Sequence, residues 1–86
     1  MKQEQVFAAM KQAVVTICDV EPASLHEDTD VTTLDIDSMT AAEIVVHVQS
    51  IIGAEIDFRK LSKDWSGFTL DALAAELLRC ADPKAS

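Results

Sequence analysis

The chain has 86 residues, the size of one small domain and too short for an active-site cleft between two lobes. Apolar residues make up 49% of it, enough for one packed core, and few of them are aromatic, which suits closely packed helices. The formal net charge of −8 argues against binding to nucleic acid or to an anionic membrane, since both require a basic face.

The first predicted element is an amphipathic helix from about Gln3 to Cys18. Its apolar residues recur at spacings of three and four, and residues with this spacing share one helix face. They are Val6, Phe7, Met10, Val14, Ile17 and Cys18. Pro22 follows shortly afterwards and prevents the helix from continuing.

A long acidic segment comes next, from Val20 to Ile36. Seven acidic residues and no lysine or arginine lie between Asp19 and Asp37. Scattered apolar residues are expected to pin this segment to the core: Leu25, Val31, Leu34 and Ile36. A loop of this length in a small domain is usually functional or braced by its own packing.

A second helix is predicted from about Ser38 to Ile52, and Gly53 is expected to end it. Its core face comprises Ile44, Val45, Val48, Ile51 and Ile52. The sequence is compatible with three ways to cap its N-terminus: Asp37, Ser38, or a capping box made by Thr40 and Glu43.

The last third of the chain predicts two further elements. Residues Phe58–Trp65 form a short helix or turn, with Leu61 and Trp65 as its apolar contacts, before Gly67 breaks it. Thr69 then caps a final helix with an aspartate in its first turn. The core face of that helix comprises Leu70, Leu73, Ala74, Leu77 and Ala81.

The predicted fold is therefore all-α, a small four-helix bundle of three main helices and one short helix with a long first loop. We expect a single domain over residues 1–86, ordered from about 3 to 81, with a mobile tail over 82–86. Cys18 and Cys80 lie in apolar helical patterns without metal-ligand spacing, so we expect buried thiols in a reducing cytosol. No apolar stretch resembles a signal segment or a membrane span, which predicts a cytoplasmic protein.

Neither catalysis nor metal binding follows from the residues. A catalytic Ser38 needs a base within reach, but His47 lies on the opposite side of the same helix and ~13 Å along its axis. His26, in the acidic loop, stays open on geometry and is little support for a triad on its own. A calcium loop starting at Asp28 needs glycine sixth and glutamate twelfth, where this chain has threonine and methionine. We expect no enzymatic activity and no bound metal.

The start of the second helix also suits a covalent phosphate ester on Ser38, because free N–H groups and the helix dipole stabilise negative charge there. The plain alternative is a serine that only caps the helix. The segment Leu34-Asp-Ile-Asp-Ser-Met39, followed by Glu43-Ile-Val45, resembles the attachment motif of acyl and peptidyl carrier proteins. That motif reads Leu-Gly-x-Asp-Ser-Leu, with a Glu-Leu pair five residues after the serine. Gly53-Ala-Glu-Ile56 resembles the stretch that closes the family's second helix, and the order of elements matches over most of the chain.

The resemblance implies an acyl-carrier-like fold in which Ser38 receives a 4′-phosphopantetheine arm from coenzyme A, with Asp37 beside it supporting the modification. A separate phosphopantetheinyl transferase would attach the arm, whose thiol would hold an acyl or aminoacyl group as a thioester. The partners would be an acyl- or aminoacyl-loading enzyme, a ketosynthase or other thioester-processing enzymes. The chain would be a free-standing carrier, monomeric on its own, of polyketide, fatty-acid or related biosynthesis.

The sequence departs from the family pattern at several positions. Asp35 stands where the family usually has glycine, and Met39 replaces leucine. Thr40, Gln49 and Ser50 stand where fatty-acid carriers are often acidic, which suggests a dedicated carrier of a specialised pathway. An aminoacyl or peptidyl carrier is the alternative, including the D-alanyl type that Asp57–Trp65 resembles. The alternative from another class is an unmodified acidic helical adaptor.

Helix geometry adds a candidate partner surface. With the core face of the second helix turned inward, Met39, Ala42 and Val46 form a second apolar stripe beside Ser38. Glu43 and His47 line a more polar edge. Two readings stay open. Either the stripe packs under the long loop, or it docks partner enzymes, with Asp37 and Glu43 facing their basic residues.

Overall fold

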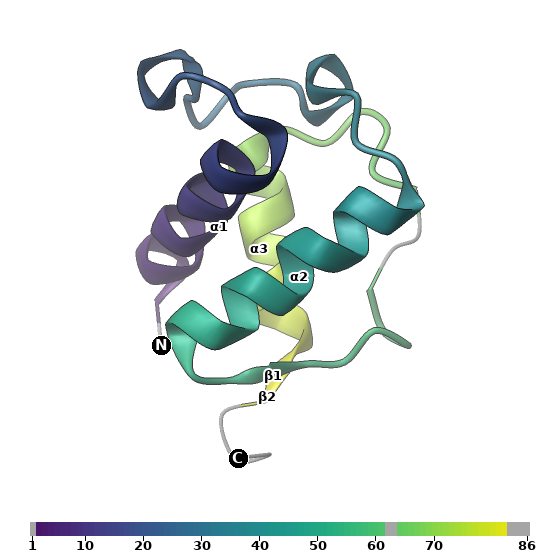
Figure 1. Ribbon diagram of the computed structural model, residues 1–86. Coiled ribbons are helices and arrows are strands. Elements are labelled where there is room, and N and C mark those ends of the chain that lie inside the picture. Colours follow the sequence, from purple (N-terminus) through teal and green to yellow (C-terminus); the bar gives the residue numbers. More distant parts are fainter. Residues whose placement is uncertain (1, 62–63, 83–86) are drawn as a thin grey trace.

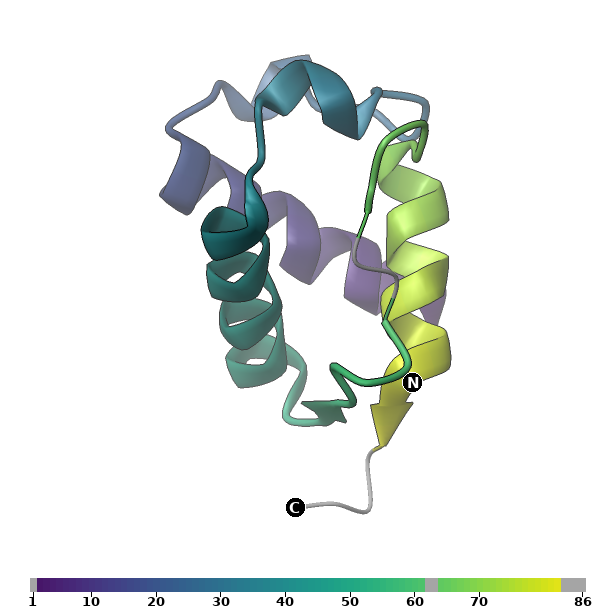
Figure 2. The ribbon, with the colours of Figure 1, turned by 90° about the vertical axis from the view of Figure 1, so that its right-hand side faces the viewer.

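The computed structural model describes residues 2–61 and 64–82. Within these ranges the chain folds into three α-helices, α1 (Gln3–Cys18), α2 (Ser38–Ile52) and α3 (Leu70–Cys80) (Figure 1). Helix α1 packs against both α2 and α3. Seen from the side, α2 and α3 stand apart and α1 crosses behind them (Figure 2). The predicted all-α architecture and its three main helices are confirmed.

The helices end where the local chemistry predicts. Gly53 terminates α2 in the left-handed conformation, with φ at 68°, a region that glycine enters without steric penalty. Thr69 caps α3, because its hydroxyl accepts a hydrogen bond of 3.1 Å from the backbone N–H of Ala72. Within the described part of the chain, no helix has the length and apolar character to cross a membrane.

The three helices bury one shared core. Its completely buried larger side chains come from all three helices and the first loop: Val6, Met10, Val14, Val31, Ile44, Val45, Val48, Leu70, Leu73 and Leu77. The prediction for Ile51 was wrong, since this residue is 42% exposed. At 100° per residue, Ile51 lies about 60° around the helix from Val48. That rotation places it at the edge of the apolar face, beside Ala8 of α1.

The long first loop is braced, as its scattered apolar residues predict. Two short 3-10 helices interrupt it, η1 (Pro22–Ser24) and η2 (Val31–Leu34). Of the four apolar residues expected to pin it, Leu25 and Val31 are buried in the core, and Leu34 and Ile36 pack against it half-buried.

The same loop is also tied to the start of α3. The N–H of Val31 donates to the carbonyl of Phe68, and the N–H of Leu70 donates to the carbonyl of Thr29, both at 2.9 Å. A third bond of 3.0 Å runs from the N–H of Asp71 to the carbonyl of Glu27. These pairings join segments about forty residues apart, so the acidic loop has a defined position over the ends of the helices.

A pair of two-residue strands closes the other end of the bundle and was not predicted. Strand β1 (Glu55–Ile56) pairs antiparallel with β2 (Ala81–Asp82). Such short strands carry no alternating pattern that a sequence reading can detect. The pairing removes Ala81 from the final helix, in which we had placed it, and includes the first residue of the predicted tail. Residues 83–86 of that tail lie outside the described residues.

The segment over residues 58–65, expected to be a short helix or turn, is a turn where it is described. Phe58 to Lys60 form that turn, and residues 62–63 lie outside the described residues. Leu61 and Trp65 are buried in the common core, as predicted.

The N-terminal cap of α2 is Asp37. Its carboxylate oxygen Oδ1 accepts a hydrogen bond of 2.8 Å from the N–H of Thr40, and its carbonyl accepts the first helical bond, from Ala41. The bond from the Thr40 N–H lowers the pKa of the Asp37 carboxyl. Ser38 is therefore the first residue inside the helix, and the Thr40–Glu43 capping box does not form.

This cap predicts a pH-dependent loss of stability in acid. Because the pKa of Asp37 is lower in the folded state, its contribution is complete above the unfolded value of about 3.9 and fades as the pH falls through the folded value. We expect Asp37→Ala to lower the melting temperature at pH 7. The difference in melting temperature between this variant and the wild type should shrink as the pH falls from 4 to 2. Asp37→Asn, which keeps a capping oxygen, is the matched control and should lose less at pH 7. A gap between Asp37→Ala and wild type that is the same at pH 7 and pH 2 would contradict the assignment.

Candidate functional site

Ser38 lies exposed at the first position of α2. Because Asp37 caps the helix, the Ser38 hydroxyl is not used for capping, and no described residue forms a hydrogen bond with it. A hydroxyl in this position is accessible to an enzyme, and the helix N-terminus stabilises a negatively charged ester there. The residue thus fits a covalently attached phosphate group.

Two hollows open on either side of Ser38. The first, of about 360 Å³, lies between the first loop and the segment before α3 and is mainly polar. Its polar lining includes Thr32, Asp35, Asp37, Asp64 and Ser66.

The second hollow, of about 290 Å³, lies between α2 and the segment after β1, and its lining is mainly apolar. Ser38 forms part of its wall. The other lining residues are Ala41, Ala42, Val45, Phe58, Leu61 and Trp65. This apolar hollow was not predicted. The one indication in the sequence was that two of the chain's few aromatic residues, Phe58 and Trp65, lie close together in it.

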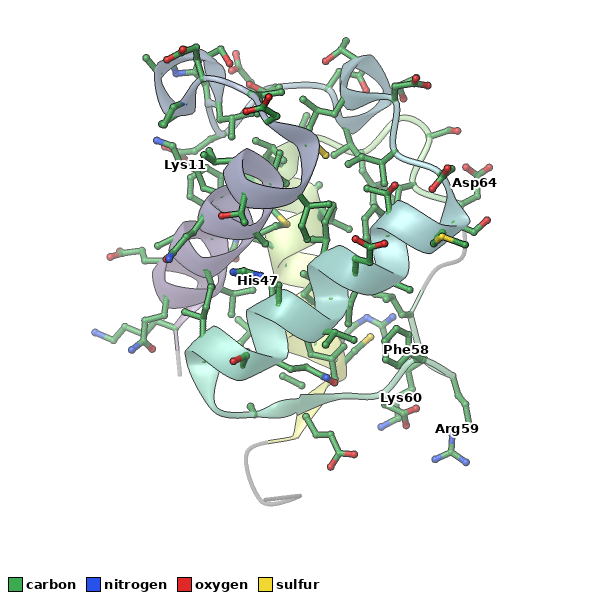
Figure 3. The ribbon with its side chains drawn as sticks, in the orientation of Figure 1. Lys11, His47, Phe58, Arg59, Lys60 and Asp64 are labelled. Atoms are coloured by element: carbon green, nitrogen blue, oxygen red, sulfur yellow. The ribbon has the colours of Figure 1, made fainter. Side chains whose placement is uncertain are left out.

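The polar hollow carries negative charge beside Ser38. Asp64 lies near the start of α2 (Figure 3) and accepts a hydrogen bond of 3.0 Å from the N–H of Ser66. That bond lowers the pKa of Asp64, as the bond from Thr40 does for Asp37. Both carboxyls are ionised at neutral pH, so a basic group on a partner is attracted to this side of Ser38.

Histidine does not contribute to the site. His47 is half-buried on α2, and His26 is exposed in the first loop. Neither of them lines either of the two hollows. The geometry therefore gives no support to a serine–histidine pair at Ser38.

The predicted stripe on α2 is exposed. Met39 is 72% exposed and Val46 is 55% exposed, and Ala42 and Glu43 also face solvent. Val48, two residues after Val46, is completely buried. The long loop therefore does not cover the stripe in the described structure. The role of the stripe in docking stays a prediction.

The backbone conformation of Asp35 explains why an aspartate can stand where carrier proteins usually have a glycine. It ends η2 in the left-handed conformation, with φ at 55° and ψ at 47°. Glycine reaches this region without penalty, and aspartate is among the few other residues found there. The loop thus takes the conformation that a glycine favours, with a carboxylate added next to the polar hollow.

A comparison with protein families agrees with this site. The family model described as the phosphopantetheine attachment site matches residues 8–77, which include Ser38 and most of the three helices. Searches of curated proteins and of solved structures found no match. Domains of this family carry a covalently attached 4′-phosphopantetheine. With most of its length matched, the chain belongs to the phosphopantetheine attachment-site family of acyl and peptidyl carrier proteins.

Proposed function

We propose that Ser38 is the attachment residue and that the chain is an acyl carrier protein. The observation that carries this proposal is the exposed Ser38 hydroxyl, left free of capping by Asp37 within the attachment motif. When attached, the arm supplies a terminal thiol that holds the cargo as a thioester. Carrier domains of this family are modified by phosphopantetheinyl transferases and exchange cargo with thioester-processing enzymes.

The surrounding residues have separate tasks in this proposal. Asp37 fixes the first turn of α2 and so the direction in which the Ser38 hydroxyl points. The carboxylates of Asp37 and Asp64 attract basic residues of the transferase to that end of the helix. The stripe of Met39, Ala42 and Val46 provides the apolar centre of the contact.

The apolar hollow favours an acyl cargo over an aminoacyl one. Its mainly apolar wall includes Phe58 and Trp65 and begins at Ser38 itself. A hydrocarbon chain gains free energy by leaving water for such a surface, whereas the ammonium group of an aminoacyl cargo does not. We place the chain in polyketide, fatty-acid or related thioester biosynthesis in the cytoplasm, with an aminoacyl or peptidyl carrier as the alternative.

The attachment residue can be tested by intact mass. We expect the wild-type chain to gain one phosphopantetheine group when incubated with coenzyme A, magnesium and a broad-specificity phosphopantetheinyl transferase. Ser38→Ala should gain nothing and keep its melting temperature, because Asp37 provides the cap. An unmodified wild type would favour the unmodified acidic adaptor, and a modified alanine variant would show that the arm is attached elsewhere.

The cargo class can be tested by loading the arm with different groups. We expect an octanoyl group to raise the melting temperature above that of the unloaded arm, and an alanyl group to leave it unchanged. Each buried methylene contributes about 0.8 kcal/mol, so burial of two would raise the melting temperature by several degrees in a domain of this size. Phe58→Ala should reduce the gain. Equal melting temperatures for the two cargoes would remove the support for acyl over aminoacyl.

The docking stripe can be tested with aspartate substitutions on two faces of α2. We expect Val46→Asp or Met39→Asp to slow modification by the transferase at least tenfold while lowering the melting temperature by only a few degrees. Val48→Asp should unfold the domain, because it buries a carboxylate in the core without a partner. If Val46→Asp unfolds the protein as Val48→Asp does, the stripe belongs to the core and docking occurs elsewhere.

A further inference from the structure

The turn after β1 concentrates positive charge in an acidic protein. Phe58, Arg59 and Lys60, here called the basic turn, are all exposed (Figure 3). Arg79 lies against it, because its Nη2 donates a hydrogen bond of 3.0 Å to the carbonyl of Lys60. Glu76 pairs with Arg79 at 3.0 Å, so the free positive charge of the turn comes from Arg59 and Lys60. The basic turn thus contrasts with the negative charge on the other side of Ser38, around Asp37 and Asp64.

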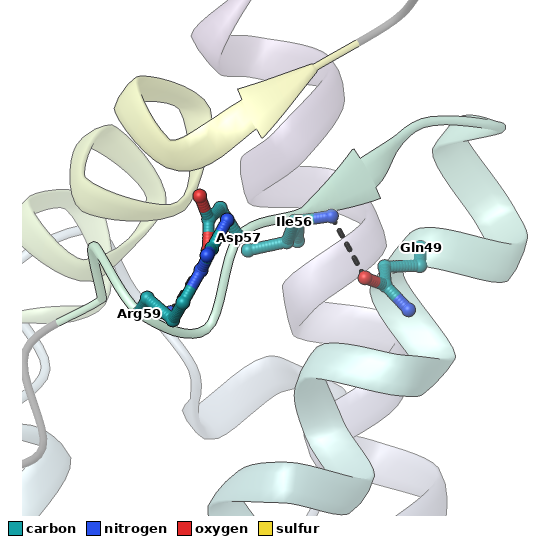
Figure 4. A network of polar contacts seen from close by, with 4 residues as sticks. All are labelled: Gln49, Ile56, Asp57 and Arg59. Atoms are coloured by element: carbon teal, nitrogen blue, oxygen red, sulfur yellow. Dashed lines mark hydrogen bonds and ion pairs between the residues drawn. The ribbon is translucent and has the colours of Figure 1, made fainter. Parts of the chain in front are cut away.

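Hydrogen bonds hold the basic turn in a fixed position. The N–H of Lys60 donates to the carbonyl of Asp57, and the N–H of Arg59 donates to the carboxylate of the same residue at 2.9 Å. The N–H of Asp57 donates to the carbonyl of Cys80 at the end of α3. On the other side, Oε1 of Gln49 accepts a bond of 2.7 Å from the N–H of Ile56 (Figure 4). The turn is therefore anchored to both α2 and α3.

The charges on the basic turn are available to a partner. Arg59 contacts Asp57 at 3.3 Å, but the arginine side chain is 91% exposed, and an ion pair this exposed is weak. Lys60 makes no ion pair with any described residue. Phe58, 46% exposed, lines the apolar hollow together with Ser38. Phe58 therefore places the basic turn at one rim of that hollow, and the N-terminal half of α2 forms the other.

An enzyme docked over Ser38 has to cover both rims. A typical protein interface takes about 800 Å² from each partner, a patch roughly 30 Å across. The whole described chain measures 33 × 23 × 19 Å. Since Ser38 and Phe58 line the same hollow, a partner centred on the serine also lies over the basic turn.

We propose that the phosphopantetheinyl transferase binds a surface of this chain that is negatively charged on one side of Ser38 and positively charged on the other. Its basic residues face Asp37 and Asp64, and an acidic group faces Arg59 and Lys60. Such a pattern fixes the orientation of docking, because a rotated complex would bring like charges together. The inference rests on the proposed role of Ser38 and names the chemistry of the partner surface that meets it.

Binding without chemistry tests the inference. The dissociation constant for a broad-specificity transferase is measured in the Ser38→Ala background without coenzyme A, so that no anionic cofactor or cargo contributes. The test variant combines Arg59→Glu with Lys60→Glu. The control combines Lys2→Glu with Lys11→Glu, which changes the net charge equally at the N-cap of α1 and within that helix. Lys11 lies far from the basic turn in Figure 3.

We expect the test variant to bind about tenfold more weakly than the control at low salt, with a difference that shrinks in 0.5 M salt. If reversal of the basic turn destabilises the fold, Arg59→Gln with Lys60→Gln should still bind more weakly than Lys2→Gln with Lys11→Gln. A test variant that binds as tightly as its control, or more tightly, would mean a uniformly basic partner and overturn the inference. If the wild type still gains the phosphopantetheine mass, that result contradicts only the docking inference and not the proposed function. If the wild type gains no mass, both the proposed function and the docking inference are contradicted.

Discussion

The hydrogen bond from the Thr40 N–H to the Asp37 carboxylate determines how the rest of the site is arranged. It caps α2 at the residue before Ser38 and satisfies a backbone donor that would otherwise need the serine oxygen. A serine that capped the helix would lose its capping geometry on esterification, and loss of a cap typically destabilises a helix by about 1 kcal/mol. Here capping and exposure of the hydroxyl belong to two adjacent residues, so the hydroxyl is free for modification.

Helix α3 does not carry Ser38, yet it positions both sides of the site. Its first residues hold the acidic loop through the backbone bonds of Leu70 and Asp71. Its last residues hold the basic turn through the carbonyl of Cys80 and the guanidinium of Arg79. The two flanks of Ser38, one acidic and one basic, are thus fixed to opposite ends of one rigid element. A partner that docks as proposed would meet a preformed surface, which limits the entropy lost on docking.

The structural features that were predictable from the sequence are those that depend on helical periodicity and local caps. The bounds of α1 and α2, the stop at Gly53 and the Thr69 cap follow from spacing and from residue types with strong local preferences. The choice between Asp37 and Ser38 as cap did not follow, because both side chains are good caps and only the backbone conformation distinguishes them.

Features made by distant pairings were not predictable either. Arg79 and Lys60 are nineteen residues apart, and neither position has a pattern that indicates their contact. The apolar hollow likewise depends on where the segment after β1 crosses α2. Ile51 was misplaced because it lies at the edge of the apolar arc, where a small rotation of the helix decides exposure. The left-handed backbone of Asp35, which makes this residue compatible with the carrier motif, was also not predictable from its residue type.

We infer that the proposed attachment to Ser38 leaves the cap of α2 intact. It is tested most directly by comparing the unmodified and arm-bearing chains for their free energy of unfolding and for hydrogen exchange at the amides of Thr40 and Ala41. We expect free energies equal within about 0.5 kcal/mol and unchanged protection of both amides, because both donate to Asp37. A loss of about 1 kcal/mol or more on modification, with faster exchange at these two amides, would show that Ser38 takes part in capping and would contradict the account.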